Sequence, residues 1–107
     1  MKLYMTELAV SDFPRAVGWY SRLLQMPPAQ VDEPNGFALF EVCGGRVALR
    51  VRTPAGRGMV LFEVEDLAEE LRRLTADAEV KLSAEGYRRA KLLDPDGNAV
   101  VLFEWAE

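Results

Sequence analysis

The side chains that could carry chemistry in this 107-residue chain are carboxylates, arginines and one thiol, because the chain contains no histidine. Histidine is the commonest general base near neutral pH and the commonest metal ligand. Ser-His and Cys-His catalysis within the chain are therefore excluded, and so is a histidine-containing metal site. The single cysteine, Cys43, cannot form an internal disulfide, which suits a reducing compartment. Since no histidine or helix N-terminus would activate it, we expect a small buried hydrophobic residue.

One short segment carries oxygen donors in a pattern similar to that of a calcium-binding loop. Asp94, Asp96 and Asn98 alternate along the segment "DPDGN". The same segment carries the residues of a tight turn, with Gly97 at the position that needs a positive φ. We therefore predict a hairpin turn here and no metal.

Composition places the chain among soluble globular proteins. Half of the residues are hydrophobic and 28% are charged, and the net charge is −4. No Lys/Arg-rich run interleaved with aromatic residues is present, which argues against nucleic acid as a partner. Apolar runs stay well short of the roughly 20 residues of a membrane span, and the N-terminus lacks a secretory pattern. We therefore expect a cytoplasmic protein with no membrane partner.

The first half of the chain predicts one helix and four strands. Ser11 and Asp12 offer an N-cap, and apolar residues at helical spacing predict a helix over 13–24 that the prolines at 27 and 28 end. The turn pairs Asn35-Gly36 and Gly44-Gly45 separate short apolar runs. The strands of this half are predicted at 3–10, 29–33, 37–43 and 46–52.

The second half repeats this order. "MTELAVSD" at 5–12 is echoed by "MVLFEVED" at 59–66, where Asp66 is the equivalent cap. A helix is predicted over 67–76, and strands at 59–64, 79–83, 87–93 and 98–105. We predict one domain, 1–107, built from two βαβββ modules at 1–53 and 58–107. A helix covers only one face of each sheet, so the other face needs the second module or a second subunit, and we expect a homodimer.

Three segments carry a resemblance to a known family. They are "LAVSDFPRAVGWYSRLLQM", "FEVEDLAEELRRL" and "LLDPDGNAVVLFE". Together they resemble the vicinal oxygen chelate superfamily, which includes glyoxalase I, bleomycin-resistance proteins and extradiol dioxygenases. The resemblance implies an α+β fold in which two tandem βαβββ modules form a curved mixed-sheet cup around a ligand site.

The resemblance also implies a metal held by the first and fourth strands of each module. Carried over by motif, the ligand positions fall on Met5, Ala48, Met59 and Val101, of which Ala48 could shift to Leu49 or Arg50. Thioether, alanine and valine offer no oxygen or imidazole donor to a divalent metal, so we expect no metal and no cofactor. Metal-dependent glyoxalase or dioxygenase activity is accordingly not expected.

Strand alternation predicts which side chains face the ligand site. Val10 and Tyr4 should pack on the helix. The residues predicted to line the pocket are Met5, Glu7, Ala48, Arg50, Met59, Leu61, Glu63, Val101, Phe103 and Trp105. An ion pair between Glu7 and Arg50 and a contact of either with ligand both remain open, and Arg46, Arg52 and Glu63 lie nearer strand ends, where solvation is the simpler reading.

Three functions fit these residues. The first is a metal-free binding protein that sequesters a small aromatic or amphipathic molecule. The acidic pI of about 4.9 favours a cationic ligand, although the arginines of the fourth strand weaken that inference. The second is a metal-independent enzyme with Glu7 or Glu63 as general base and an arginine as oxyanion stabiliser, which requires Glu7 to lie in a dry pocket, unpaired by Arg50. The third is a non-catalytic dimer whose cup is filled by its own side chains.

Overall fold

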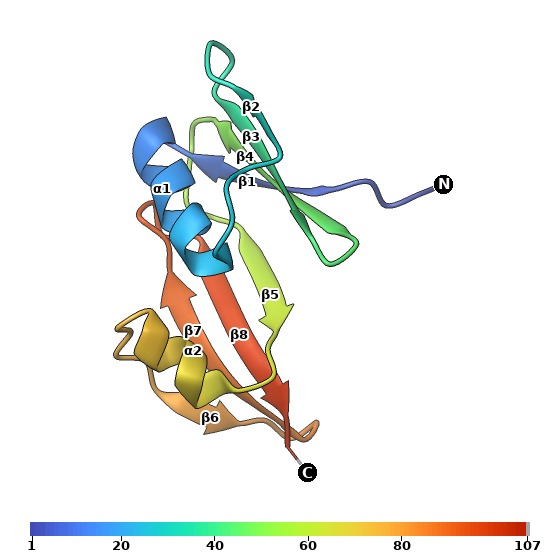
Figure 1. Ribbon diagram of the computed structural model, residues 1–107, viewed down its shortest axis with the longest axis vertical. Coiled ribbons are helices and arrows are strands. Elements are labelled where there is room, and N and C mark those ends of the chain that lie inside the picture. Colours follow the sequence, from blue (N-terminus) through green and yellow to red (C-terminus); the bar gives the residue numbers. More distant parts are fainter. Residues whose placement is uncertain (107) are drawn as a thin grey trace. The chain divides into compact units, whose positions relative to one another are not determined.

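The chain has an α+β architecture of two four-stranded mixed sheets, each with one helix (Figure 1). A computed structural model describes residues 1–106. It divides into two compact units. Unit 1 contains residues 1–58 and 94–98, and unit 2 contains residues 59–93 together with the chain from residue 99.

Sheet 1 lies in unit 1 and has the strand order β1-β4-β3-β2. Strand β1 runs parallel to β4, with Glu7 opposite Ala48, and the remaining pairs are antiparallel. The helix α1 contacts β3 and β4. The elements are β1 (Thr6–Val10), α1 (Phe13–Leu24), β2 (Gln30–Asp32), β3 (Phe37–Val42) and β4 (Gly45–Val51).

Sheet 2 lies in unit 2 and repeats this topology as β5-β8-β7-β6. Strand β5 runs parallel to β8, with Leu61 opposite Val101, and α2 contacts β7 and β8. The elements are β5 (Met59–Glu63), α2 (Leu67–Arg73), β6 (Val80–Leu82), β7 (Tyr87–Leu93) and β8 (Ala99–Trp105).

Both helices begin at the predicted aspartates. Asp12 and Asp66 have extended backbone, and each side chain accepts a hydrogen bond from the backbone N–H three residues ahead. The prediction of helix 13–24 is confirmed. The second helix ends at Arg73 rather than 76, because Thr75 adopts a left-handed conformation and the Ala76 N–H turns back to the Leu71 carbonyl.

The first strand is shorter than predicted, and its beginning at residue 3 is wrong. With Thr6 opposite Val47, Tyr4 would stand opposite Gly45, the first residue of β4, and the residues before Tyr4 would run past that strand and find no partner. The expectation that Tyr4 packs on the helix is also wrong. It is 56% exposed, and the Arg46 guanidinium lies over its ring at 4.6 Å.

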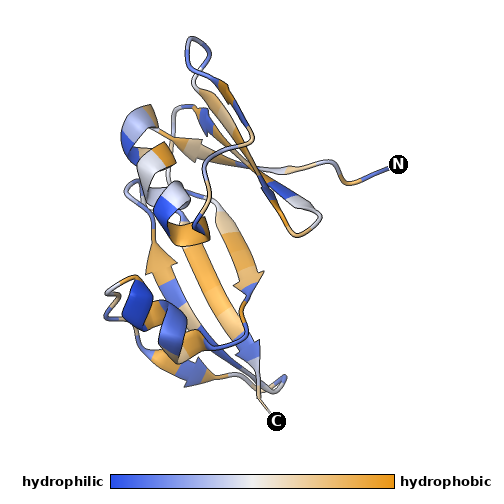
Figure 2. Cartoon of the chain, viewed as in Figure 1, coloured by the Kyte–Doolittle hydropathy of each residue, from blue (hydrophilic) through white to orange (hydrophobic). Residues whose placement is uncertain are grey.

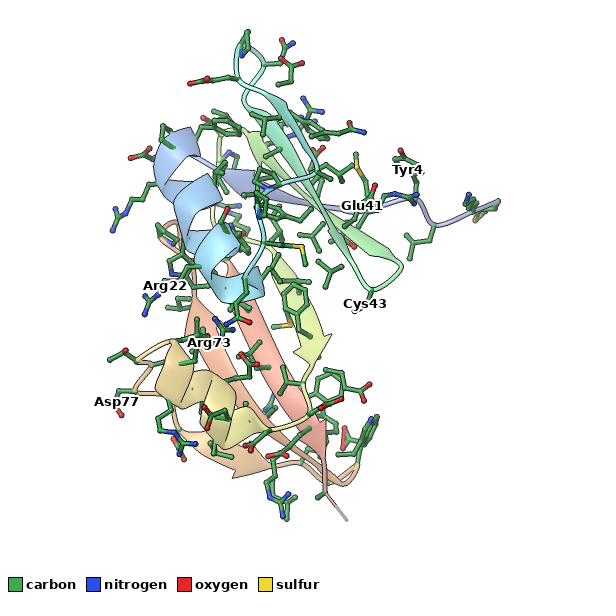
Figure 3. All side chains as sticks on the ribbon, in the orientation of Figure 1. Tyr4, Arg22, Glu41, Cys43, Arg73 and Asp77 are labelled. Atoms are coloured by element: carbon green, nitrogen blue, oxygen red, sulfur yellow. The ribbon has the colours of Figure 1, made fainter. Side chains whose placement is uncertain are left out.

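The turn between β3 and β4 falls one residue earlier than predicted. Its central residues are Cys43 and Gly44, both with positive φ, whereas Gly45 already pairs with Val42. The register is held at the opposite end, where the Val51 N–H donates to the Gly36 carbonyl and the Val51 side chain packs where a Gly36 Cβ would stand. The expectation that Cys43 is buried is wrong, because the thiol is exposed at the tip of the hairpin (Figure 3).

The core of unit 1 is the space between α1 and one face of sheet 1. Tyr20 of α1 is fully buried and lies 6.5 Å from the Phe40 ring of β3, centroid to centroid. Leu8 and Val10 of β1 lie on this same face and are equally buried. Glu7 and its neighbours of the same parity therefore occupy the opposite face, which we call the helix-free face of sheet 1.

Unit 2 shows the same division less completely. Leu67 and Leu71 of α2 are buried, as are Ala90 and Leu102 of the sheet. Along β5 the exposure alternates, and the residues that point away from this core are the exposed ones. Figure 2 shows β5 and β8 as predominantly hydrophobic and α2 as largely hydrophilic. Within residues 1–106 neither helix has the length and apolar character needed to cross a membrane.

Candidate functional site

The charged group on the helix-free face of sheet 1 is a carboxylate held between two guanidinium groups. Arg50 Nε donates to Glu7 Oε2 and Arg52 Nε donates to Glu7 Oε1, each at 3.0 Å. The parallel register positions them, because Glu7 stands opposite Ala48 and Arg50 is the next residue of β4 on that face. The Arg50 guanidinium also lies 4.6 Å from the centre of the Phe37 ring. Of the two possibilities left open for Glu7 and Arg50, the structure shows the ion pair.

These contacts set the protonation of Glu7. Burial of the carboxyl by itself would raise its pKa, but the hydrogen bonds and positive charges of Arg50 and Arg52 outweigh that effect and lower the pKa. A carboxylate with a lowered pKa and both oxygens engaged is a poor proton acceptor. The unpaired, dry environment that a general base at Glu7 requires is absent from its surroundings in residues 1–106.

Replacing Glu7 with Gln is expected to reduce stability at neutral pH and not at low pH. A lowered pKa in the folded state adds stability above the unfolded value of 4.5, and this stability is lost as the pH falls through the folded value. Because the pair is partly exposed, we expect a difference of about 1 kcal/mol at pH 7. Urea unfolding of both proteins from pH 7 to pH 3 measures it, with Glu41→Gln on the exposed side of β3 as control. A difference that persists unchanged at pH 3 would contradict the assignment.

The helix-free face of sheet 2 carries the predicted residues of the second half. Met59, Leu61 and Trp105 are 56%, 50% and 55% exposed. Glu63 is exposed opposite Phe103, and Val101 is buried beside Leu61. The face is thus apolar along β5 and β8 and ends in aromatic rings.

The aromatic rings form a cluster of three. Phe103 and Trp105 were predicted to face the ligand site, and the structure adds Tyr87 of β7 opposite Trp105. The three ring centroids are 5.4 to 5.7 Å apart in tilted or edge-to-face arrangements. Because the rings already pack against one another, they lose little further conformational entropy when a ligand binds. Trp105 stays accessible to a flat ligand.

The family's metal does not fit the residues at the ligand positions. Met5 lies just before β1 and offers a thioether, and Met59 does the same in β5. Ala48 and Val101 have hydrocarbon side chains. The carboxylate beside Ala48 is that of Glu7, which Arg50 and Arg52 already engage. In residues 1–106 no three His, Cys, Asp or Glu side chains gather in a way that could hold a metal ion.

Asp94 and Asn98 form a buried polar network with Tyr20. The sequence predicted the turn that contains them but not this network. Asp94 Oδ2 accepts from the Tyr20 hydroxyl at 2.7 Å and from Asn98 Nδ2 at 2.8 Å, while Oδ1 accepts from the N–H groups of Asp96 and Asn98. Burial, reinforced by the Asp94 carboxylate, raises the pKa of Tyr20 far above its usual value, so the phenol stays a donor.

Asn98 connects this network to the first strand. Its Nδ2 also donates to the Ala9 carbonyl, and its Oδ1 accepts from the Gly58 N–H. The predicted hairpin turn is confirmed, with Gly97 at φ 95°. The side chains of Asp94 and Asn98 are engaged in these hydrogen bonds. Through the Ala9 carbonyl they hold the end of β1, the strand that carries Glu7.

A surface depression of about 420 Å³ lies at the C-terminal end of α2. It contains none of the predicted site residues. Its lining residues are Leu71, Arg72, Thr75, Ala76 and Asp77. Because it is wide open to solvent and lined by a helix end, we do not assign a function to it.

Two neighbours of the candidate site residues, Phe37 and Tyr87, were missed because their positions depend on strand register. Phe37 pairs with Arg50 only when Cys43 and Gly44 form the turn, and the predicted turn paired Arg50 with Leu39. Tyr87 pairs with Trp105 once Leu93 is placed opposite Ala99 across the "DPDGN" turn, so that register could have revealed it. Arg52, which we expected to be solvated, is 60% exposed yet bound to Glu7.

Comparison with protein families gives one match over almost the whole chain. The Glyoxalase/Bleomycin resistance protein/Dioxygenase superfamily matches residues 2–102. Comparison with curated protein sequences gives no significant match.

Solved structures of similar fold include a glyoxalase/bleomycin resistance protein from Catenulispora acidiphila. It is 29% identical, with a TM-score of 0.81 over 96% of this chain and 98% of that one. A bleomycin resistance determinant encoded on the transposon Tn5 is 19% identical, with a TM-score of 0.76 over 97% and 98% of the two chains. Lactoylglutathione lyase from Agrobacterium tumefaciens is 18% identical, with a TM-score of 0.78 over 96% and 92%. The last two show a shared fold alone.

Proposed function

This chain belongs to the Glyoxalase/Bleomycin resistance protein/Dioxygenase superfamily, and from that premise we propose that it is a metal-independent binding protein that sequesters a small aromatic or amphipathic molecule. The observation that carries the proposal is the helix-free face of sheet 2. There the packed rings of Tyr87, Phe103 and Trp105 adjoin the exposed apolar side chains of Met59 and Leu61.

Two physical arguments support binding over catalysis. Exposed apolar side chains gathered on one face mark an interaction surface, and pre-packed aromatic rings add stacking contacts to it. The carboxylate best placed to act as a base, Glu7, is instead held as an anion by two arginines. The apolar face of sheet 2 therefore supports ligand binding. The pairing of Glu7 with two arginines argues against that residue as a general base.

A thermal-shift screen of planar aromatic and amphipathic compounds tests this function. A binding compound is expected to raise the melting temperature in a concentration-dependent way, and Trp105→Ser is expected to weaken its affinity by about tenfold. Leu82→Ser is the matched control, because Leu82 is an exposed apolar residue of the edge strand β6. Failure of the whole screen, or equal effects of the two variants, would contradict the proposal.

We also propose that the protein is a homodimer in a reducing compartment such as the cytoplasm. Each sheet ends in two edge strands, and the outward-facing backbone groups of an edge strand can pair with a second copy of the chain. Light scattering after gel filtration should give twice the 12.0 kDa chain mass at micromolar concentration. A stable monomer would contradict the dimer.

A further inference from the structure

The arginines of sheet 1 are arranged to receive a further anion. The side chains of Arg50 and Arg52 each make one hydrogen bond within residues 1–106, and both bonds run through Nε to Glu7. Glu7 therefore does not engage the two Nη groups of either guanidinium. The edge formed by two Nη groups matches the paired oxygens of a carboxylate or phosphate.

Both guanidinium groups are also held in place. Glu7 anchors each by its Nε, and the ring of Phe37 supports Arg50 from beneath. The backbone of Arg52 is fixed as well, because its N–H donates to the Val10 carbonyl at 3.1 Å. A guanidinium that is already ordered loses less conformational entropy when an anion binds. Glu7 acts here as a positioning residue.

The local charge favours an anion. One carboxylate between two guanidinium groups leaves an excess positive charge at Arg50 and Arg52. Two other acidic side chains share this face, and each has its own neighbour. Glu41 stands opposite Arg46, and the Asp32 carboxylate accepts from Asn35.

The acidity of the whole chain does not extend to this unit. Unit 1 has seven basic and seven acidic residues, whereas unit 2 has six basic and ten acidic ones. The net charge of −4 therefore arises in unit 2. The acidic pI is therefore no reason to expect a cationic ligand at sheet 1.

We infer that Arg50 and Arg52, positioned by Glu7, form an oxyanion-binding site on sheet 1 for a small molecule that carries a carboxylate or phosphate group. This inference rests on the proposed function only in that the protein binds a small molecule, and it assigns the charge of that molecule. Carboxylate and phosphate share the chemistry that the two guanidinium edges recognise.

Four probes of one shape test the inference by calorimetric titration: 2-naphthoate, 2-naphthyl phosphate, neutral 2-naphthamide and cationic 2-naphthylmethylammonium. One or both anions should bind more tightly than the amide by about tenfold or more, and the cation should bind least. Arg50→Gln and Arg52→Gln should each remove most of that preference. Arg50→Lys should restore it only in part, because lysine keeps the charge and loses the planar edge. Arg57→Gln, an exposed arginine of the same unit, is the control and should change nothing.

The outcomes separate this inference from the proposed function. If the amide binds as tightly as the anions, or if the arginine variants leave the preference intact, the oxyanion site is overturned while ligand binding stands. If anion binding depends on Arg50 and Arg52 and is unaffected by Trp105→Ser, the oxyanion site stands by itself, and the thermal-shift screen decides whether the aromatic surface of sheet 2 binds a ligand. If none of the four probes binds, the oxyanion site is overturned, and the thermal-shift screen decides the proposed function.

Discussion

Asp94→Ala is expected to lower the free energy of unfolding by about 3–5 kcal/mol, the range for breaking a buried polar network at one member. Asp94 is 5% exposed, and its carboxylate accepts from the Tyr20 hydroxyl, from Asn98 Nδ2 and from two backbone N–H groups. Removing it leaves the Tyr20 hydroxyl and the N–H groups of Asp96 and Asn98 without this acceptor, and each unpaired buried donor costs about 1–3 kcal/mol. Urea unfolding followed by circular dichroism measures the loss.

Two further variants calibrate that result. Tyr20→Phe removes one hydroxyl and should cost about 1–2 kcal/mol, because it takes away a donor and leaves Asp94 with its other partners. Asp77→Ala removes an exposed carboxylate in the loop after α2 (Figure 3) and should change stability by less than about 0.5 kcal/mol. If Asp94→Ala were no more harmful than Asp77→Ala, the network would not stabilise the fold as described.

Gly56→Ala is expected to cost about 3 kcal/mol or more, through two separate effects. Gly56 has a φ of 83°, and a Cβ there would lie 2.8 Å from the Asp96 carbonyl carbon and closer still to its oxygen. The left-handed conformation costs a residue with a Cβ about 1–2 kcal/mol, and the clash with backbone adds to it. Thermal or urea unfolding gives the difference.

Two other glycines separate these effects. Gly44 has a φ of 87° but open space around it, so Gly44→Ala should show the conformational cost alone. Gly18 lies in α1 with nothing near its Cβ position, so Gly18→Ala should stabilise the protein by up to about 1 kcal/mol. Equal effects of Gly56→Ala and Gly44→Ala would show that the contact with Asp96 is unimportant.

The features that the sequence predicted correctly are the ones set by neighbouring residues. The caps at Asp12 and Asp66 and the positive φ of Gly97 arise within a few residues of chain. The repeat of "MTELAVSD" and "MVLFEVED" likewise predicted two equivalent modules, because the two copies keep their helix caps and their strand pairing. Glu7 faces Ala48 in the first sheet as Leu61 faces Val101 in the second.

The features that were missed depend on residues far apart in the sequence. The start of β1 depends on its pairing with β4, and the partner of Arg50 is set by which two residues form the turn between β3 and β4. Tyr20 and Asp94 are 74 residues apart, so nothing local marks their hydrogen bond. Arg52 and Glu7 are also far apart, by 45 residues, and for this reason the sequence could suggest Glu7 as a base without showing that two arginines hold it as an anion.

The central claim is that this member of the superfamily binds its ligand without the family's metal. It is tested most directly by offering Mn²⁺, Fe²⁺, Co²⁺, Ni²⁺ and Zn²⁺ to the purified protein, anaerobically for iron, and measuring the metal retained per chain after gel filtration. Because Met5, Ala48, Met59 and Val101 offer no oxygen or imidazole donor and Glu7 is held by two arginines, we expect far less than one ion per chain for every metal. Retention of one ion per chain of any of them, lost when Glu7 is replaced by Gln, would contradict the account.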